Sequence, residues 1–447
     1  MTKMTVDPRD GRATRRDFLA TSAKAGAAAT LVAAGWQVLS PSADADAAST
    51  TLTYIGLKDN ANPNVTVEML RLFEQQHPGV KTKFIFAPTG SADAYHDKLV
   101  TLFSAHDSSI DIADSDVIWQ AQWAPAGWVA PLDTYLTVAQ RKQYAPGMIW
   151  ADTISNHLYG IPWMLDTGHL FYRKDILDAN GLKPAKTWPE LAQQLTMLLK
   201  KYPTMIGFVP CYQKGQQLIC NFMEYAWSNG GDLIDEKTGK VVFNSPQNVQ
   251  ALQFMMDLIK NKLVQPGVVS MNLDPEGRQL FTTGKAIYHR NWNYVYALSQ
   301  DTKGGSKVAG KVGVTDIPHF AGHSTASCAG GWQYVVNNYS KNKDLALKLA
   351  VFLGGPAMQK YRALHGSFSP AYLPANDDPA VVGKFPSYPL LAQQAKTERS
   401  RSKTPLWTQI SQTAEAELSN ALTFTKTAKQ ALDDASTKIT SVMSGEQ

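Results

Sequence analysis

The chain has 447 residues, with 43 Lys and Arg, 38 Asp and Glu, and a formal net charge of +5 at pH 7. A chain of this length is too long for a single hydrophobic core, so we expect two domains. The small excess of positive charge is spread along the sequence, so we expect neither a nucleic acid nor an anionic membrane as a partner.

The first 47 residues have the pattern of an export signal. Arg15 and Arg16 precede a weakly apolar stretch, and the small residues at 45–47 are typical of a cleavage site. Paired arginines at this place indicate the twin-arginine pathway. A membrane-spanning helix is disfavoured, because the apolar stretch has about 15 residues and a span needs about 20. We therefore expect a periplasmic protein. The sequence has no cysteine near the cleavage site, so we do not expect a lipid anchor.

After the signal, short apolar strands alternate with amphipathic helices. This alternation is typical of α/β domains with a largely parallel sheet. In chain order we expect a strand at 51–55, a helix at 64–76, a strand at 80–86, a helix at 95–105, a strand within 110–119, a crossover at 161–163, a strand at 168–172, a helix at 188–201, a strand at 206–209, a helix at 245–260, strands at 286–289, 311–317 and 332–336, a helix at 343–353, and mostly helix over 411–443.

The sequence has three cysteines, Cys211, Cys220 and Cys328. Disulfides persist in the oxidising compartment that an export signal implies. Cys211 and Cys220 are near enough in sequence to close a loop, and three buried thiols are an equally good alternative. The spacing of the cysteines does not match a zinc site.

Common signatures of catalysis and cofactor binding are missing from the sequence, among them H-E-x-x-H, G-x-S-x-G and the P-loop. Asp111, Asp114 and Asp116 lie close together, but they lack the glycine and the distal glutamate of a calcium-binding loop. We therefore expect no metal and no cofactor. An exported glycosidase that uses Asp116 and Asp166 as its acid pair is an alternative, since any two carboxyl groups can meet in a fold.

Five segments, taken in order, carry a resemblance to a known family. They are DVIW at 116–119, LYGIPWMLDTGHLFYRKDIL at 158–177, KTWPEL at 186–191, FTTGKAI at 281–287 and AGGW at 329–332. Together they resemble the extracellular solute-binding proteins, family 1, of sugar ABC importers, and within it the trehalose/maltose-binding branch. The likeness extends over nearly the whole chain that follows the export signal.

The resemblance implies a two-lobe α/β periplasmic binding protein fold of type II, like that of maltose-binding protein, with the ligand in a cleft between the lobes. It implies a monomer that is not an enzyme. Such a protein binds a sugar, most simply a disaccharide such as trehalose, maltose or sucrose, and delivers it to the transmembrane subunits of an ABC permease. The expected parts are an export signal at 1–47, an N-terminal lobe of 48–161 plus 312–354, and a C-terminal lobe of 162–311 plus 355–447.

Positions that match the family suggest the site residues. A sugar site needs flat aromatic surface for stacking, together with carboxylate and guanidinium groups that bind hydroxyls in pairs. Asp116 and Asp166 would accept hydroxyl groups, Arg362 would donate, and the backbone N–H of Gly331 could approach the ligand closely because it has no Cβ. The aromatic candidates are Trp292 and Trp332 as stacking surfaces, with Tyr95 and Trp119 as walls.

Each candidate also has an ordinary structural explanation. The aspartates could hold turns, the tryptophans could be core, and Arg362 could lie on a solvated helix face. A binding protein for another solute, such as a glycerophosphodiester or a polyamine, is a further alternative. Phosphate would call for clustered Lys and Arg or a Gly-rich helix start, and the sequence has neither.

Overall fold

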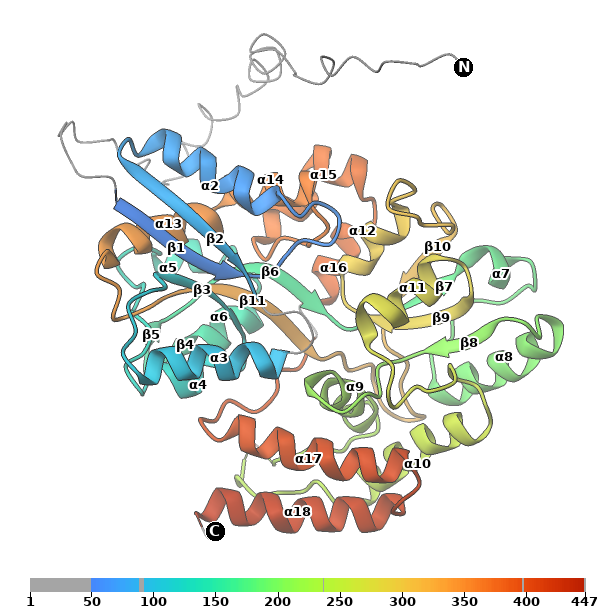
Figure 1. The fold of residues 1–447 in the computed structure, drawn as a ribbon. Helices are drawn as coiled ribbons and strands as arrows, with labels where there is room; N and C mark the ends of the chain where they lie inside the picture. The colour runs from blue at the N-terminus through green and yellow to red at the C-terminus, as the bar shows by residue number, and fades with distance from the viewer. Residues whose placement is uncertain (1–49, 88–91, 236, 396–397, 446–447) are drawn as a thin grey trace, which may run out of the picture. The chain divides into compact units, whose positions relative to one another are not determined.

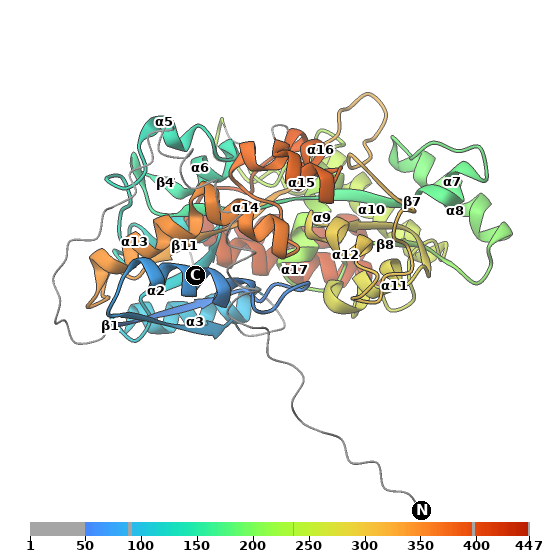
Figure 2. The same ribbon diagram turned by 90° about the horizontal axis from the view of Figure 1, so that it is seen from above.

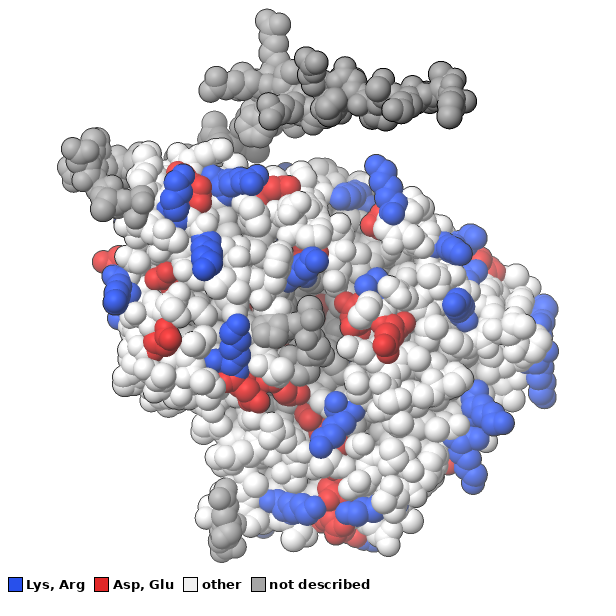
Figure 3. Space-filling view, viewed as in Figure 1, with Lys and Arg blue, Asp and Glu red and all other residues white. Residues whose placement is uncertain are grey.

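The computed structural model describes residues 50–87, 92–235, 237–395 and 398–445. The export signal expected at 1–47 lies outside these residues. Within the described part, no helix combines the length and the apolar character that crossing a bilayer requires. On the face seen in Figure 3, basic and acidic side chains are interspersed over the surface.

Five strands form the first sheet, in the order β2-β1-β3-β11-β6 (Figure 1). β1 is parallel to β2 and β3, whereas β11 is antiparallel to both of its neighbours, β3 and β6. Because β11 runs against both, β3 and β6 point the same way and end at the same edge of the sheet. The strands are β1 Thr50–Gly56, β2 Val80–Phe86, β3 Ile112–Asp116, β6 Ile161–Thr167 and β11 Ala329–Val336.

Four strands form the second sheet, in the order β10-β7-β9-β8. β7 is antiparallel to β10 and β9, and β8 is parallel to β9. A small hairpin, β4 Thr153–Ile154 with β5 His157–Leu158, stands apart from both sheets. The strands of the second sheet are β7 His169–Arg173, β8 Ile206–Val209, β9 Ala286–Asn291 and β10 Val312–Thr315.

Helices pack on each sheet, and together with the sheets they make the two-lobe α/β fold (Figures 1 and 2). The first lobe has α2 Val65–Gln76, α3 Ala92–Ser104, α4 Gln120–Trp123, α5 Val138–Arg141, α6 Pro146–Asp152, α13 Lys343–Gly354, α14 Pro356–His365, α15 Pro379–Lys384 and α16 Tyr388–Gln394. The second lobe has α7 Lys174–Asp178, α8 Trp188–Lys201, α9 Gln216–Trp227, α10 Pro246–Lys260, α11 Arg278–Thr282, α12 Tyr294–Gln300, α17 Trp407–Leu422 and α18 Ala428–Ser444.

Local sequence explains these elements well. Every residue of β3, which lies inside the first sheet, is buried, as expected for a strand covered on both faces. The residues of the edge strand β6 are buried as well, because residues 369–371 run beside it, and the backbone N–H of Leu165 donates to the carbonyl oxygen of Ser369 at 2.9 Å. Two of the longer helices begin at a capping side chain: Thr187 accepts from the backbone N–H of Glu190, and Ser245 from that of Asn248. The predicted strands and helices are therefore confirmed, within a few residues at their ends.

Three differences from the expected elements have physical reasons. The stretch 411–443 contains two helices, α17 and α18, which are separated by a turn around Phe424 (φ 60°). The sequence analysis missed α9: its polar residues Gln217, Asn221 and Glu224 repeat at helical spacing, but Asn221 and Glu224 are buried, so they do not mark a solvent-exposed face. It did not reveal α14 either, which starts at Pro356 directly after α13.

The first two crossings between the lobes lie later than expected. The chain remains in the first sheet through β6, and it enters the second sheet at Gly168, the residue between β6 and β7. Residues 162–167 therefore belong with the first lobe. Strand β10 pairs with β7 in the second sheet, so residues 312–315 belong with the second lobe, and the chain returns between 316 and 328.

The last crossing also lies later than expected. Helix α14 packs on α2 of the first lobe, where the Tyr361 hydroxyl donates to Glu68 at 3.2 Å. The backbone N–H of Ser367 donates to Asp59 at 2.9 Å. The chain leaves the first lobe only in the segment 398–406, which we call the crossing segment. We propose lobe boundaries that follow the strands and helices: 50–167 plus 329–395 for the first lobe, and 168–328 plus 407–445 for the second.

All three cysteines are free and buried. Cys211 lies in the loop before α9, and the thiol of Cys220 on α9 is hydrogen-bonded with that of Cys328, directly before β11. Of the two alternatives that the sequence left open, the structure has the buried thiols.

We expect Ellman's reagent to label none of the three thiols in the native protein and all three after unfolding without reductant. Each cysteine has at most 2% of its surface exposed, which blocks the reagent until the chain unfolds. Labelling of a single thiol after unfolding would contradict this arrangement, because it would indicate one disulfide.

Candidate functional site

Three neighbouring strands bring four of the predicted residues to one edge of the first sheet. Trp332 on β11 is the register partner of Asp116 on β3, and Gly330 on β11 is the partner of Asp166 on β6. Asp116 is the last residue of β3, and Asp166 is the last but one of β6. Ligands of open α/β sheets bind at the carboxyl ends of strands, so this edge is the candidate site.

An aromatic wall stands at this edge. The ring of Trp332 lies 6.1 Å from that of Tyr95 on α3, nearly parallel to it, and 5.5 Å from that of Trp119, at right angles. Tyr95 and Trp119 are buried, and the Tyr95 hydroxyl donates to the carbonyl oxygen of Ile55 at 3.1 Å. Trp332 is partly exposed. Tyr95 and Trp119 therefore pack against the ring of Trp332, which remains partly exposed.

Gly331 has a conformation that favours glycine. Its φ of +128° is strained for residues with a side chain, and a Cβ here would lie 2.6 Å from Cε of Met148 on α6. Its carbonyl oxygen accepts from the backbone N–H of Val117 at 3.3 Å, which ties β11 to the loop after Asp116.

Asp116 is paired with an arginine that the sequence analysis did not single out. Its Oδ1 accepts from Nη2 of Arg401 at 3.1 Å and from the backbone N–H of Ile118 at 3.2 Å. Arg401 comes from the crossing segment, and its Nη1 donates to Gln216 at the start of α9, 3.3 Å away. The Nε of Arg401 is buried and has no hydrogen-bond partner in the described part of the chain.

Arg362 lies elsewhere, inside the first lobe. Its guanidinium is 4.2 Å from the ring of Trp163, and its Nη2 donates to the Tyr334 hydroxyl at 2.8 Å. Only 2% of its surface is exposed. It is thus not on a solvated face, and Arg401 rather than Arg362 is the arginine that pairs with Asp116.

Asp166 carries a buried carboxyl group that is only partly satisfied. It accepts the backbone N–H of Asn293, but its Oδ1 has no partner among the residues described. Burial raises its pKa well above the ordinary value, nearby Arg290 opposes the shift, and the charge of Asp116 adds to it. A buried oxygen without a partner is costly, so the described residues leave the Asp166 carboxyl group incompletely satisfied.

Trp292, directly after β9, is an aromatic side chain of the second lobe with 7% of its surface exposed. Its Nε1 donates to Gln217 on α9 at 2.8 Å, and the guanidinium of Arg290 lies 4.1 Å from its ring centre. A Cβ on Gly330 would stand 3.1 Å from the ring, next to the backbone of Asp166. Trp292 of the second lobe therefore lies beside Gly330 and Asp166 of the first lobe, and the two lobes meet at this point.

A buried ion pair fixes Arg290. Its Nε donates to Oε2 of Glu224 on α9 at 2.8 Å, and its Nη2 donates to Oε1. The backbone N–H of Cys328 donates to the same Oε1 at 3.2 Å. A Cβ at Gly168 would collide with this carboxylate and with Arg290. Gly168 thus lets the chain cross between the lobes directly over the pair.

The three aspartates of the sequence 111–116 diverge in space. Asp111 accepts from the Ser340 hydroxyl, Asp114 from the Tyr54 hydroxyl, and Asp116 from Arg401. In the described residues, no group of His, Cys, Asp and Glu side chains is arranged to hold a metal ion.

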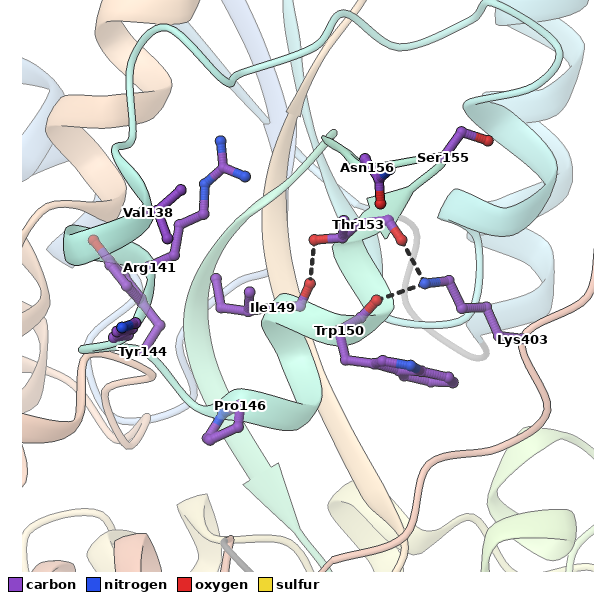
Figure 4. Close-up of a pocket in the computed structure, with 11 residues that line it drawn as sticks. Val138, Arg141, Tyr144, Pro146, Ile149, Trp150, Thr153, Ser155, Asn156 and Lys403 are labelled. Atoms are coloured by element: carbon purple, nitrogen blue, oxygen red, sulfur yellow. Dashed lines mark hydrogen bonds between the residues drawn. The ribbon is translucent and has the colours of Figure 1, made fainter. Parts of the chain in front are cut away.

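A separate hollow of about 750 Å³ lies in the first lobe, lined by residues of α5, α6, the β4–β5 turn and Lys403. Lys403 lies over the ring of Trp150, 4.6 Å from its centre, and donates to the carbonyl oxygens of Trp150 and Thr153 (Figure 4). None of the eight predicted residues lines this hollow, so it is distinct from the candidate site.

Comparisons with known proteins agree with this geometry. The sequence pattern of the family described as bacterial extracellular solute-binding protein matches residues 47–360. A probable ABC transporter-binding protein of Deinococcus radiodurans is 32% identical over 70% of this chain and 74% of its own length. The chain therefore belongs to the family of bacterial extracellular solute-binding proteins. It is the exported, substrate-binding component of an ABC transporter, and its relatives are binding proteins rather than enzymes.

Two further similarities concern proteins with named ligands. The structure of maltose-bound MalE3 from T. maritima is similar with a TM-score of 0.82 and 31% identity, over 88% of this chain and 99% of that one. A galactooligosaccharide-binding protein of Bacillus subtilis is 26% identical over 65% of this chain and 68% of its own length.

We expect Gly168→Ala to lower the free energy of unfolding by about 3 kcal/mol, because a methyl group there would break the buried pair of Arg290 and Glu224. Chemical denaturation measures this. Gly383→Ala on α15 is the matched control, since a Cβ at Gly383 meets nothing within 4 Å. We expect it to be neutral or slightly stabilising. Equal stability of both variants would contradict the close approach at Gly168.

Proposed function

We propose that this solute-binding protein binds a neutral sugar, a disaccharide such as maltose, trehalose or sucrose, and delivers it as a monomer to the transmembrane subunits of an ABC permease. One observation carries the proposal. The partly exposed ring of Trp332 lies on the strand between Asp116 and Asp166, at the carboxyl edge of the first sheet. The ligands named for MalE3 and for the galactooligosaccharide-binding protein support it.

Each group has a role in this proposal. Trp332 and Trp292 stack on the apolar faces of the sugar rings, one from each lobe. Asp166 accepts a hydroxyl through its unpartnered oxygen, and Arg401, held by Asp116, donates through its free Nε. A carboxylate and a guanidinium side by side suit a sugar, whose hydroxyls both donate and accept hydrogen bonds.

Closure of the lobes accompanies binding in this proposal. Contacts between the lobes support it: the Asn60 amide donates to Asp274 at 2.9 Å, and Asp93 on α3 accepts the backbone N–H of Gln216 on α9. A ligand can favour the closed form only by binding it more tightly than the open form. A sugar that contacts Trp332 on one lobe and Trp292 on the other does so.

Calorimetry with maltose, trehalose and sucrose tests the proposal. We expect at least one sugar to bind, and we expect Trp332→Ala to weaken its affinity at least tenfold, about 1.4 kcal/mol, through loss of the stacking surface. Trp150→Ala is the matched control, because Trp150 is an exposed tryptophan of the separate hollow. We expect it to bind as the wild type does.

Two outcomes would count against the proposal. If none of the sugars releases heat or raises the melting temperature of the wild type, the ligand belongs to another class. If Trp332→Ala and Trp150→Ala bind equally well, the site lies elsewhere in the protein.

We further propose export through the twin-arginine pathway. Arg15 and Arg16, which lie outside the described residues, support this through their place ahead of an apolar stretch. We expect the double variant Arg15→Lys, Arg16→Lys to leave the precursor in the cytoplasm, since lysine keeps the charge but not the guanidinium geometry. Cell fractionation measures it. Undiminished periplasmic yield would indicate the general secretory route.

A further inference from the structure

Glu398, at the start of the crossing segment, places a second carboxyl group beside Asp166. Its Oε2 accepts from the hydroxyl of Thr167, the residue after Asp166 in β6, at 2.7 Å. Its Oε1 would lie 3.0 Å from a Cβ on Gly147, so α6 covers it from the other side. Glu398 is thus held between β6 and α6 at the same edge of the sheet as Asp166.

Both carboxyl groups have an oxygen that nothing satisfies. Asp166 Oδ1 and Glu398 Oε1 are buried, and neither has a hydrogen-bond partner among residues 50–87, 92–235, 237–395 and 398–445. The arginines of the site do not hydrogen-bond to them. Arg290 pairs with Glu224 and Arg401 with Asp116, and the remaining Nη1 of Arg290 and Nε of Arg401 have no partner among the described residues either. Because leaving such groups unpaired is costly, these two oxygens point to a ligand that offers hydrogen-bonding groups to both.

We propose that Glu398 is a further ligand-binding residue, a proposal that rests on the proposed function. Glu398 contacts the sugar as a neutral carboxylic acid and donates a hydrogen bond to a sugar oxygen. Asp166 accepts a hydroxyl beside it. A neutral acid can donate and accept, as a sugar hydroxyl does, whereas an ionised carboxylate only accepts.

The surroundings of Glu398 favour its neutral form. On β6 it faces Thr167 and the carboxyl group of Asp166, and on α6 it faces Gly147, which carries no charge. Arg401 and Lys403 lie on its own segment, but Arg401 pairs with Asp116, and Lys403 donates to backbone carbonyls of the hollow. Burial raises the pKa of Glu398 to about 8, and the charge of Asp166 adds to the shift.

The sign of the pH dependence follows from this. Binding needs the protonated acid, so affinity is full well below pH 8 and falls as the pH rises through about 8. Glutamine resembles the neutral acid in shape and can also donate and accept, but it does not titrate. Asp166, whose pKa burial also raises, can accept a hydrogen bond in either protonation state, so its titration does not remove its contact. Glu398→Gln should therefore keep binding and lose the fall through about pH 8.

Calorimetry with maltose at pH 6.5 and pH 9.0, on the exported chain, tests the proposal. We expect the affinity of the wild type to fall at least fivefold between the two pH values. Glu398→Gln should bind within threefold of the wild type at pH 6.5 and should not weaken at pH 9.0. Glu398→Ala should bind at least tenfold more weakly than the wild type at pH 6.5.

Glu415→Gln is the matched control. Glu415 on α17 is a buried acid whose pKa burial also raises to about 8, and it pairs with Gln216 rather than with Asp166. This variant should keep the fivefold fall of the wild type. If the fall persists in Glu398→Gln, or disappears in Glu415→Gln instead, the proposal is wrong.

The outcomes also separate this proposal from the proposed function. If the wild type binds no sugar, the proposed function fails. If the wild type binds maltose and Trp332→Ala weakens it, while both Glu398 variants bind as the wild type does at both pH values, only the role of Glu398 fails. Thermal unfolding checks that each variant is folded, and the glutamine variant alone decides the result if the alanine variant does not fold.

Discussion

The buried ion pair of Arg290 and Glu224 is the interaction on which the rest of the site depends. Glu224 lies on α9 and Arg290 on β9, so the pair fixes a helix to the sheet of the second lobe. The same carboxylate holds the backbone N–H of Cys328, where the chain returns to the first lobe. Gly168, where the chain first leaves that lobe, passes directly over it. Two crossings therefore meet at one pair of charges.

Placing this pair in the interior carries a desolvation cost, which its mutual attraction offsets only when the geometry is good. Here the contact is bidentate, and the guanidinium also lies over the ring of Trp292. The pair thus orients an aromatic side chain of the site and sets a positive charge near Asp166. Two apolar side chains in place of the pair could stabilise the fold equally well, but they would not accept the backbone N–H of Cys328 or place a positive charge near Asp166.

Local patterns were sufficient to predict most strands and helices, because alternation and capping are properties of neighbouring residues. They failed where burial is complete on all sides. The polar residues Asn221 and Glu224 of helix α9 are buried in the interior. The apolar run of β6 contains Pro162, which made it resemble a crossover rather than a strand. The crossings were therefore expected too early, although the two-lobe fold itself was predicted correctly.

The part of the candidate site that could be predicted consists of residues on strands, because the register of neighbouring strands decides which residues meet. Asp116, Asp166, Gly331 and Trp332 meet because β3, β11 and β6 are neighbours. Arg401 and Glu398 were not predictable in this way, since the crossing segment has no periodic pattern and reaches the site only through the tertiary fold. Arg362 shows the limit: whether an arginine on a helix lies on a solvated face or in a core depends on what packs over it, here Trp163.

The arrangement of charges explains why binding and closure would be coupled in the proposed function. The acids at the edge of the sheet lie far apart in the sequence. Asp116 and Asp166 come from β3 and β6, and Glu398 comes from the crossing segment. Burying these groups removes their water, and Asp166 Oδ1 and Glu398 Oε1 find no hydrogen-bond partner among the described residues in its place. An empty closed form therefore bears the cost of unpaired oxygens, whereas a ligand with several hydroxyl groups removes it. The closed form is then favoured mainly when a ligand of that chemistry is present, and a solute without hydroxyl groups gains little from closure.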